Sequence, residues 1–164
     1  MEFNMKNTII IFKPFVIREF MEFKERSIND YSQALIRSGK NSESNALGEA
    51  LKEYDAMLPQ GIDTPNHHFN NITNEQGENI GYIWFEIRSK DMFICEFLIY
   101  ENHRGKGYGR QTLFELEQIA ERMSVSIIRL HAFEYNTGLQ KFYKYMGYEI
   151  TSTRPGSCFM QKVI

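Results

Sequence analysis

The 164-residue sequence has little cysteine or proline and no long apolar run. Its two cysteines, Cys95 and Cys158, are far apart, and neither belongs to a Cys-x-x-Cys pair. A disulfide framework or a zinc site is therefore not expected, and a reducing cytoplasm is the expected location. No apolar stretch approaches the ~20 residues that span a bilayer, so we expect no membrane partner. Residues 1–7 lack the apolar segment of a signal peptide and are predicted to form a disordered lead.

The sequence also lacks an excess of charge of either sign. It has 19 Lys and Arg and 21 Asp and Glu, which gives a net charge of −2. No nucleic-acid partner is expected, since modules that bind nucleic acid are usually basic. Apolar residues make up 42% of the chain and aromatic residues 14%, which is enough to offset the entropy of an ordered chain. Length and composition predict a single domain over residues 1–164.

Strand-like and helix-like segments alternate along the chain. Runs of β-branched and apolar residues predict strands, and apolar residues at helical spacing predict helices. The expected strands cover residues 8–13, 68–74, 80–87, 92–100, 126–133, 148–151 and 158–163. The expected helices lie between Pro14 and Gly39, between Ser42 and Pro59, over 109–123 and over 137–146. The order β-α-α-β-β-β-α-β-α-β-β indicates an α/β or α+β domain with a mixed sheet.

Three local patterns add detail to this arrangement. The second helix carries an apolar stripe predicted to face the core, made of Leu47, Ala50, Leu51, Tyr54 and Leu58. The run 92–100 is apolar except for Glu96 and predicts a central strand covered on both faces. Thr137 and Gln140 have the spacing of a capping box at the start of the last helix.

The segment 97–109, FLIYENHRGKGYG, joins a predicted buried strand to a predicted helix. Its closely spaced glycines permit a tight turn, and the free N–H groups at the start of a helix attract anions. Arg104 and Lys106 add two positive charges, so the segment favours a pyrophosphate cradle. The P-loop pattern does not fit, because Gly107 follows Lys106. The dinucleotide fingerprint does not fit either, because the spacing is G-x-G-x-G after the fourth strand.

Two motifs identify a family. Arg104–Gly109 resembles the R/Q-x-x-G-x-G/A signature of the GNAT superfamily of acyl-CoA-dependent N-acetyltransferases. Asn136–Tyr148 is similar to that family's later motif, an Asn followed by a helix with a Tyr and then Gly-Tyr or Gly-Phe. The chain departs from the pattern at Gly138 and Leu139, where alanines are common, and at Glu101, where a proline often stands. The resemblance implies the GNAT fold: a mixed central sheet with a splayed strand pair, a bulge in strand 92–100, and helices on both faces.

The resemblance also implies acetyl-CoA as the co-substrate and no metal. Its pantetheine arm would lie between the splayed strands 92–100 and 126–133, where Asn136 would hydrogen-bond it. Main-chain groups of Phe97, Leu98 and Ile99 would contact pantetheine and the acetyl group, and an N–H near Ile99 would polarise the thioester carbonyl. The residues that would hold the pyrophosphate are Arg104, Gly105, Lys106, Gly107, Tyr108 and Gly109.

Direct attack by a neutral amine in a ternary complex requires a proton acceptor for the amine and a proton donor for the departing sulfur. Tyr143 occupies the position of the family's usual phenolic acid and is predicted to donate to the CoA thiolate; the alternative is a core aromatic residue. Glu96 is the first candidate base, because burial raises the pKa of a carboxylate. His131 is the second, since its reference pKa of ~6.5 suits proton transfer. The alternatives are a buried ion pair for Glu96 and a hydrogen-bonded core histidine for His131.

The two N-terminal helices form one wall of the acceptor site in this family, and here they carry acidic and aromatic residues that favour a small cationic amine. The predicted acceptor contacts are Tyr31, Tyr54 and Trp84. The first expectation is acetylation of a primary amine of a small molecule or an amino acid. The alternatives are a protein N-terminus or peptide, an antibiotic amine, or an acyl-CoA-binding module without catalysis. The chain is expected to be a monomer or a homodimer paired through its last strand.

Two further features receive structural interpretations. His67 and His68 are adjacent, but no third metal ligand stands at a suitable spacing, so strand-edge histidines are expected and a metal site is not. Cys95 is predicted to be a core residue, because no neighbour in the sequence indicates a nucleophile.

Overall fold

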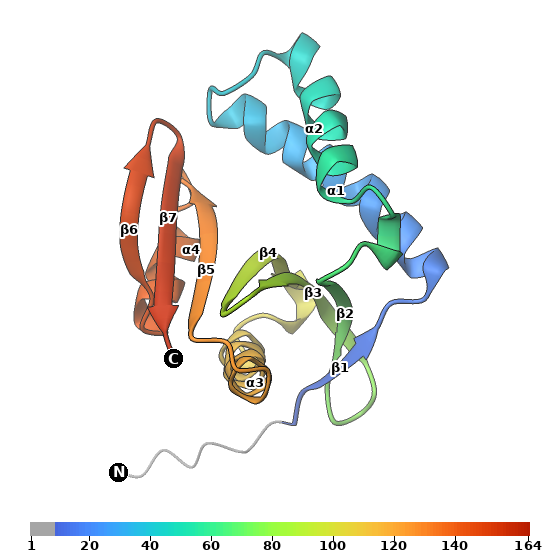
Figure 1. The fold of residues 1–164 in the computed structure, drawn as a ribbon, viewed down its shortest axis with the longest axis vertical. Coiled ribbons are helices and arrows are strands. Elements are labelled where there is room, and N and C mark those ends of the chain that lie inside the picture. Colours follow the sequence, from blue (N-terminus) through green and yellow to red (C-terminus); the bar gives the residue numbers. More distant parts are fainter. Residues whose placement is uncertain (1–8) are drawn as a thin grey trace. The chain divides into compact units, whose positions relative to one another are not determined.

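The computed structural model describes residues 9–164, and the predicted lead at residues 1–7 lies outside them. The described chain forms seven strands and four α-helices in the predicted order, which confirms the α/β class (Figure 1). The strands are β1 (Ile11–Pro14), β2 (His67–Thr73), β3 (Asn79–Arg88), β4 (Asp91–Ile99), β5 (Ile127–Phe133), β6 (Glu149–Arg154) and β7 (Ser157–Val163). The helices are α1 (Ile17–Arg37), α2 (Glu43–Met57), α3 (Tyr108–Arg122) and α4 (Thr137–Tyr145), with short 3-10 helices η1 (Gly61–Asp63) and η2 (Glu101–His103).

Packing divides the chain into two compact units. The first unit contains the stretch that ends at Pro14, His68–Ile128 and Val163–Ile164. The second unit contains Phe15–His67 and Arg129–Lys162. In neither unit does the described chain form a helix that is both long and apolar enough to cross a membrane.

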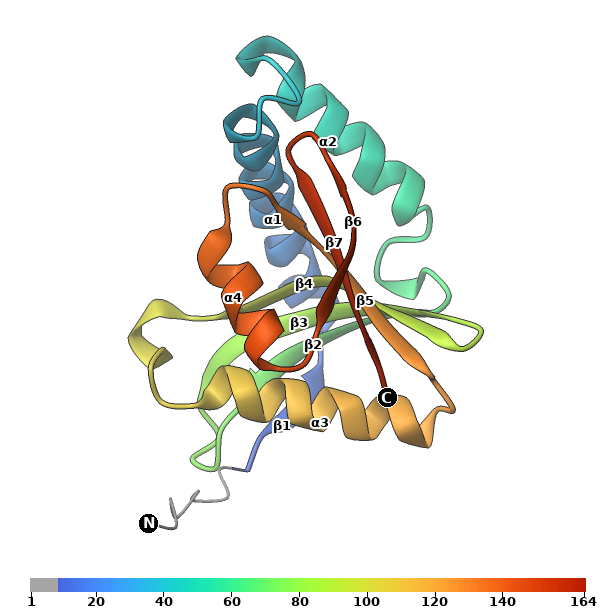
Figure 2. The ribbon, with the colours of Figure 1, turned by 90° about the vertical axis from the view of Figure 1, so that its left-hand side faces the viewer.

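Strands β1, β2, β3 and β4 are neighbours in chain order in the first unit, and β1 pairs antiparallel with β2 as β3 does with β4. Residues 80–85 of β3 are buried without interruption, which means that both faces of β3 are covered. The prediction that 92–100 would be covered on both faces is wrong, because most residues of β4 are only half-buried. Helix α3 packs against β4 (Figure 2).

Helices α1 and α2 pack side by side in the second unit (Figures 1 and 2). The buried residues of α2 are Ala46, Ala50 and Tyr54, which recur at intervals of four. The two alanines keep the helix surface flat, so the neighbouring helix can approach closely. The predicted stripe is therefore wrong at Leu47 and Leu51, whose side chains are 49% and 44% exposed.

The remaining strands of the second unit lie in the order β5-β7-β6 (Figure 2). Strands β6 and β7 form an antiparallel hairpin, and every residue of β6 is exposed. The predicted capping box is wrong, because Asn136 is the N-cap of α4: its Oδ1 accepts a hydrogen bond from the Leu139 N–H at 3.2 Å. The first helix, expected between Pro14 and Gly39, begins at Ile17, because Pro14 is the last residue of β1.

Candidate functional site

Strand β4 contains a β-bulge close to its centre. Trp84 of β3 is opposite Glu96, whereas the next residue, Phe85, is opposite Ile94, so Cys95 has no partner across the ladder. A bulge of this kind bends a strand and changes the direction of the groups around it. The bulge that the family resemblance implied for strand 92–100 is thus confirmed.

Beyond the bulge, the β4 main chain offers N–H groups that β3 does not use. The Tyr100 N–H donates to the Ile80 carbonyl at 2.9 Å. Because hydrogen-bonding directions alternate along an antiparallel pair, the Leu98 N–H points toward β3, and the N–H groups of Phe97 and Ile99 point away from it. Of the three residues predicted to contact pantetheine, Phe97 and Ile99 have their N–H groups directed for such a contact, and Leu98 does not.

The turn between β4 and α3 depends on two glycines in left-handed conformation. Gly105 has φ +74° and Gly107 has φ +84°, and a Cβ added at either would meet nothing within 4 Å. The requirement for glycine is therefore one of backbone conformation, not of space. Gly107 is the N-cap of α3 and offers no capping side chain, so the first N–H groups of α3 receive no side-chain cap.

The charged residues of this turn are exposed, and one of them is anchored. The Nε of Arg104 donates to the Ile99 carbonyl at 2.9 Å, which holds the arginine beside the end of β4. Lys106 is exposed between the two glycines. The segment 104–109 thus presents two cations and a helix N-terminus together, as a site for a pyrophosphate group requires.

Two residues that the sequence analysis did not single out support this turn. A Cβ on Gly81 would lie 2.1 Å from the Leu98 carbonyl oxygen, so only glycine permits the close approach of β3 to the end of β4. The Oδ1 of buried Asn74 accepts the N–H groups of Gln76 and Glu78, and its Nδ2 lies 3.5 Å from the Tyr108 hydroxyl. Asn74 therefore connects the β2–β3 turn to the first residue of α3.

Glu96, the first candidate base, is half-buried at the bulge. Its Oε1 accepts a hydrogen bond from the Tyr82 hydroxyl at 3.1 Å. Tyr82 is buried and was not identified from the sequence, because a strand tyrosine carries no signal of its partner.

Tyr143, the candidate proton donor, is only 3% exposed and packs edge-to-face against Tyr148 with 5.2 Å between ring centroids. Burial raises the pKa of its phenol, so the hydroxyl keeps its proton. Within residues 9–164, no hydrogen-bond partner occupies that hydroxyl. Tyr143 thus satisfies the requirements of a core aromatic residue and those of a proton donor.

His131 lies in a polar contact of the second unit. Its Nε2 is 2.9 Å from Ser157 Oγ, and Lys40 Nζ donates to the same oxygen. Burial, with a smaller contribution from the Lys40 charge, lowers the pKa of His131 to about 4. The imidazole is therefore neutral at pH 7, but it is a weaker base than the reference pKa of ~6.5 led us to expect.

The predicted acceptor residues have different environments. The Tyr31 hydroxyl donates to Glu53 Oε2 at 2.5 Å, and its half-buried ring lies 6.1 Å from that of Tyr54. The Tyr54 side chain is buried, and its hydroxyl is hydrogen-bonded to Ser27 Oγ. Trp84 is 2% exposed and stacks on Phe69 in the first unit, a position that indicates packing and gives no support to an acceptor contact.

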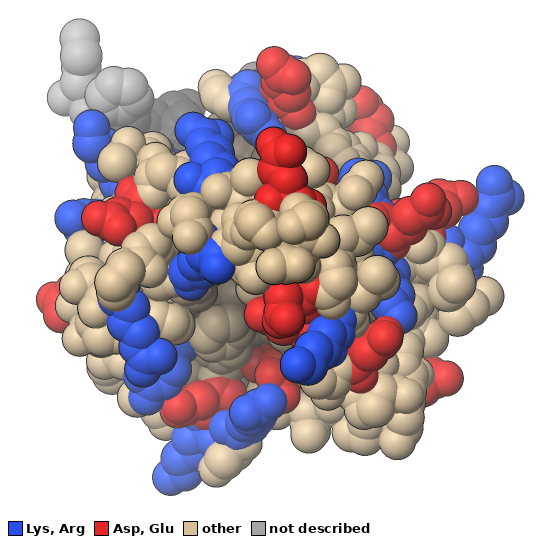
Figure 3. Space-filling view, turned by 90° about the horizontal axis from the view of Figure 1, so that it is seen from above, with Lys and Arg blue, Asp and Glu red and all other residues tan. Residues whose placement is uncertain are grey.

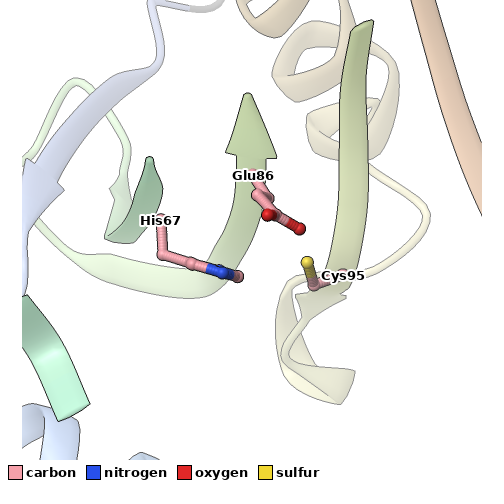
Figure 4. A group of neighbouring side chains, drawn as sticks. All are labelled: His67, Glu86 and Cys95. Atoms are coloured by element: carbon pink, nitrogen blue, oxygen red, sulfur yellow. The ribbon is translucent and has the colours of Figure 1, made fainter. Parts of the chain in front are cut away.

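A second group of polar side chains surrounds the bulge. The Glu86 carboxylate of β3 and the Cys95 sulfur of β4 lie within 4.8 Å of each other, and Figure 4 draws them with His67, the first residue of β2. Burial raises the pKa of the Cys95 thiol, so it is protonated. Glu86 already accepts a hydrogen bond from Arg88 Nε at 2.5 Å. A metal ion bound by Cys95 would have to displace the thiol proton, because sulfur binds a metal as the thiolate.

Known proteins match this chain over most of its length. The model of the acetyltransferase (GNAT) family matches residues 29–148. The uncharacterized N-acetyltransferase YdgE of Bacillus subtilis is 35% identical over 140 residues, which cover 83% of this chain and 89% of YdgE. The structure of the acetyltransferase YycN of Bacillus subtilis is 27% identical with a TM-score of 0.84, and the match covers 89% of this chain and 96% of YycN.

A more distant structure shares the fold. PaiA N-acetyltransferase from Thermoplasma acidophilum, solved in complex with coenzyme A, is 18% identical with a TM-score of 0.67 over 95% of this chain and 99% of PaiA. The bulged strand, the glycine turn before α3 and the family match lead to one conclusion: the chain belongs to the acetyltransferase (GNAT) family.

Proposed function

We propose that this protein transfers the acetyl group of acetyl-CoA to a primary amine of a small molecule or an amino acid. The observation that carries the proposal is the continuous segment from the bulge at Cys95 to the uncapped start of α3. Along this segment the N–H groups of Phe97 and Ile99, the left-handed glycines and the two cations all suit one long anionic ligand with an amide-rich arm.

Each residue has a distinct task in this proposal. Arg104, Lys106 and the N–H groups of 107–109 bind the pyrophosphate. The N–H groups of Phe97 and Ile99 bind the pantetheine arm and the thioester carbonyl. Asn136 uses Oδ1 to cap α4, which leaves its Nδ2 to donate a hydrogen bond to the ligand arm. Acetyl-CoA supplies the activated acyl group.

The proton transfers complete the proposal. Tyr143 donates a proton or a hydrogen bond to the sulfur, because its buried phenol is protonated. Glu96 and His131 are the two candidate acceptors of the amine proton. The lowered pKa of His131, about 4, makes it a weaker base at pH 7 than an ordinary histidine, so Glu96 remains the first candidate.

The amine acceptor and the location are also proposals. A spermidine N-acetyltransferase from Vibrio cholerae, solved with CoA and spermine, shares the fold at 12% identity and a TM-score of 0.64. That protein shows that the fold accommodates amine substrates, but it does not select one for this chain. The two free cysteines are consistent with a reducing cytoplasm.

A thiol-release assay with acetyl-CoA tests the proposal. The purified chain is mixed with acetyl-CoA and a panel of polyamines, amino acids, N-terminal peptides and aminoglycosides, and free CoA is measured. We expect release that depends on one class of amine. Binding of acetyl-CoA with no turnover on any acceptor would favour a binding module, and failure to bind acetyl-CoA would overturn both interpretations.

A further inference from the structure

Strand β6 is the outer strand of the second unit and has only β7 beside it (Figure 1). The order β5-β7-β6 places β7 between two strands, so the last strand has no free edge for the pairing of two copies that the sequence led us to expect there. Every residue of β6 is exposed, and Ile150 is 41% exposed. Within residues 9–164, the main chain of β6 makes no hydrogen bonds beyond its ladder with β7. An edge strand in this state is a template for a further strand.

The main chain of β6 directs hydrogen-bonding groups outward at two positions. Arg154 and Ser157 flank a two-residue hydrogen-bonded turn, so the groups of Arg154 point toward β7. Because directions alternate along an antiparallel ladder, the N–H and C=O of Thr153 point away from β7. The same alternation, counted along β7 to Met160, directs the main-chain groups of its partner Ile150 outward.

A bulge in β6 determines which side chains share a face. The register of the β6–β7 ladder shifts between Ile150 and Ser152, so Thr151 is one extra residue in β6. Such a residue shifts the alternation of side chains by one position. Glu149 and Arg154 are an odd number of positions apart and would lie on opposite faces of a regular strand, but the bulge places them on the same face.

Contacts on the two faces of β6 agree with this count. Ile150 and Thr153 both line a pocket of about 380 Å³, so their side chains share one face. Arg154 borders the same pocket, but its guanidinium lies 5.8 Å from the ring centre of Phe159. Phe159 follows the pocket-lining Cys158 in β7 and therefore belongs to the other face.

The two ends of β6 carry opposite charges. Within the described residues, neither Glu149 nor Arg154 has an ion-pair partner. In a second copy of β6 that lies antiparallel beside the first, about a two-fold axis at the middle of the strand, Arg154 of the partner subunit stands opposite Glu149. The same register places Ile150 opposite Thr153 of the partner subunit, which are the two positions with outward main-chain groups. Opposite charges that face each other across a strand pair stabilise it.

We propose that two copies of this chain form a homodimer through β6, in which Glu149 of each copy pairs with Arg154 of the partner subunit. The complementarity of β6 to itself selects a second copy over a strand of another protein, since a two-fold interface requires a self-complementary surface. The contact is limited to one strand of six residues per copy, so the dimer is weak and reversible. This inference goes beyond the proposed function and does not rest on it.

Reversal of charge tests this dimer. Sedimentation equilibrium of the unchanged full chain, from about 1 µM to 1 mM, should show a monomer–dimer equilibrium. Glu149→Arg and Arg154→Glu each place like charges opposite each other at both ends of the pairing, so each should raise the dimer Kd about tenfold. The double variant Glu149→Arg, Arg154→Glu restores opposite charges and should restore the Kd. A chain that stays monomeric throughout, a Kd that neither single variant raises, or a double variant that restores nothing overturns the proposal.

Disulfide cross-linking tests the register. An oxidised equimolar mixture of Ile150→Cys and Thr153→Cys chains should give a linked heterodimer, because opposite residues of a hydrogen-bonded pair have Cα atoms about 5.5 Å apart, within the reach of a disulfide. Neither variant alone should cross-link, since two copies of one position lie beyond the limit of about 7 Å in this register. Cross-linking of a single variant, or none in the mixture, overturns the proposed pairing.

A control separates the pairing from net charge and from folding. Lys52→Glu changes an exposed lysine of α2 and alters the net charge as Arg154→Glu does, so it should leave the Kd unchanged. An equal effect of the two substitutions would overturn the proposal. Far-UV circular dichroism and acetyl-CoA binding should be the same in all of these variants, because none changes a residue to which the proposed function gives a task. Failure of the proposed function has a different sign, which is that the unchanged chain does not bind acetyl-CoA.

Discussion

Tyr143 is both a buried core residue and the proposed proton donor. Its ring packs against Tyr148, whereas its hydroxyl has no protein partner among the described residues. We expect Tyr143→Phe to lower kcat about 10²-fold, since general acid catalysis contributes on this scale, with little change in the affinity for acetyl-CoA. The measurement is steady-state thiol release together with titration of acetyl-CoA.

Tyr145 provides the matched control for Tyr143. It belongs to the same helix but is 70% exposed, so Tyr145→Phe should leave kcat unchanged. If Tyr143→Phe turns over at the normal rate, Tyr143 is a core residue only and the proton comes from elsewhere.

The pKa of His131 makes stability depend on pH. Its pKa is about 4 in the folded chain, below the reference value of ~6.5 expected in the unfolded chain. Between these values the unfolded chain binds more protons, so the free energy of unfolding should decrease as the pH falls from about 6.5 toward 4. In His131→Gln this decrease should be smaller, as thermal unfolding at pH 7 and pH 5 would show. An identical loss of Tm in both proteins would contradict the shifted pKa.

The same substitution also distinguishes the two candidate bases. We expect the pH–rate profile of kcat/KM to change in Glu96→Gln or in His131→Gln, whichever side chain accepts the amine proton. The other variant should keep the profile of the unchanged chain. If neither profile changes, the amine loses its proton to water and no dedicated base exists.

At the level of single residues, the sequence predicted those that belong to a contiguous motif. Arg104, Gly105 and Gly107 could be identified because their chemistry depends on neighbours in the chain. Tyr82, the partner of Glu96, could not, because the contact depends on the pairing of two strands and not on a motif within one segment. Contacts between different elements decide whether a side chain has a structural role or a chemical one, and such contacts cannot be read from a single segment.

The type and the order of the helices and strands could be predicted from the sequence. The ends of the helices and the faces that they bury were predicted less well. Leu47 and Leu51 were assigned to the core because they continue an apolar period, but the close pairing of α1 and α2 buries Ala46 and Ala50 instead. The start of α4 at Thr137 was predicted, but its N-cap was placed one residue late, because Thr and Asn are both common caps and only the contact of Asn136 with Leu139 distinguishes them.

The start of α3 is the element for which backbone conformation matters most. Gly107 has φ +84°, a conformation that costs an L-residue about 1–2 kcal/mol. We expect Gly107→Ala to lower the free energy of unfolding by about that amount and to weaken acetyl-CoA binding, because the helix N–H groups move. Chemical denaturation and calorimetric titration measure the two effects.

Gly48 offers the opposite case in α2. It has an ordinary helical conformation, and nothing lies within 4 Å of an added Cβ. Gly48→Ala should therefore raise the free energy of unfolding by about 0.5–1 kcal/mol and leave acetyl-CoA binding unchanged. Equal effects of the two substitutions would show that the turn at Gly107 tolerates a side chain.

For the whole molecule, the small net charge hides local differences. Figure 3 shows Lys and Arg intermixed with Asp and Glu on the face that it presents, with no large field of one sign. Attraction of an anionic ligand must then come from a few residues at short range, such as Arg104 and Lys106. Because these two are exposed, acetyl-CoA binding should weaken as salt is added.

The whole chain is also expected to unfold in one step, although its packing divides it into two units. The chain passes from one unit to the other after Pro14, His67, Ile128 and Lys162, and three of these crossings lie within strands β2, β5 and β7. Neither unit is a continuous segment, so neither is able to unfold without breaking strands that also belong to the other. Calorimetry should therefore give one transition, with equal calorimetric and van't Hoff enthalpies.

Acetyl-CoA at 100 times its Kd should stabilise that single transition by about 2.7 kcal/mol, and the double variant Arg104→Gln, Lys106→Gln should show a smaller shift at the same concentration. Two separate transitions, of which acetyl-CoA moves only one, would contradict the prediction of a single domain.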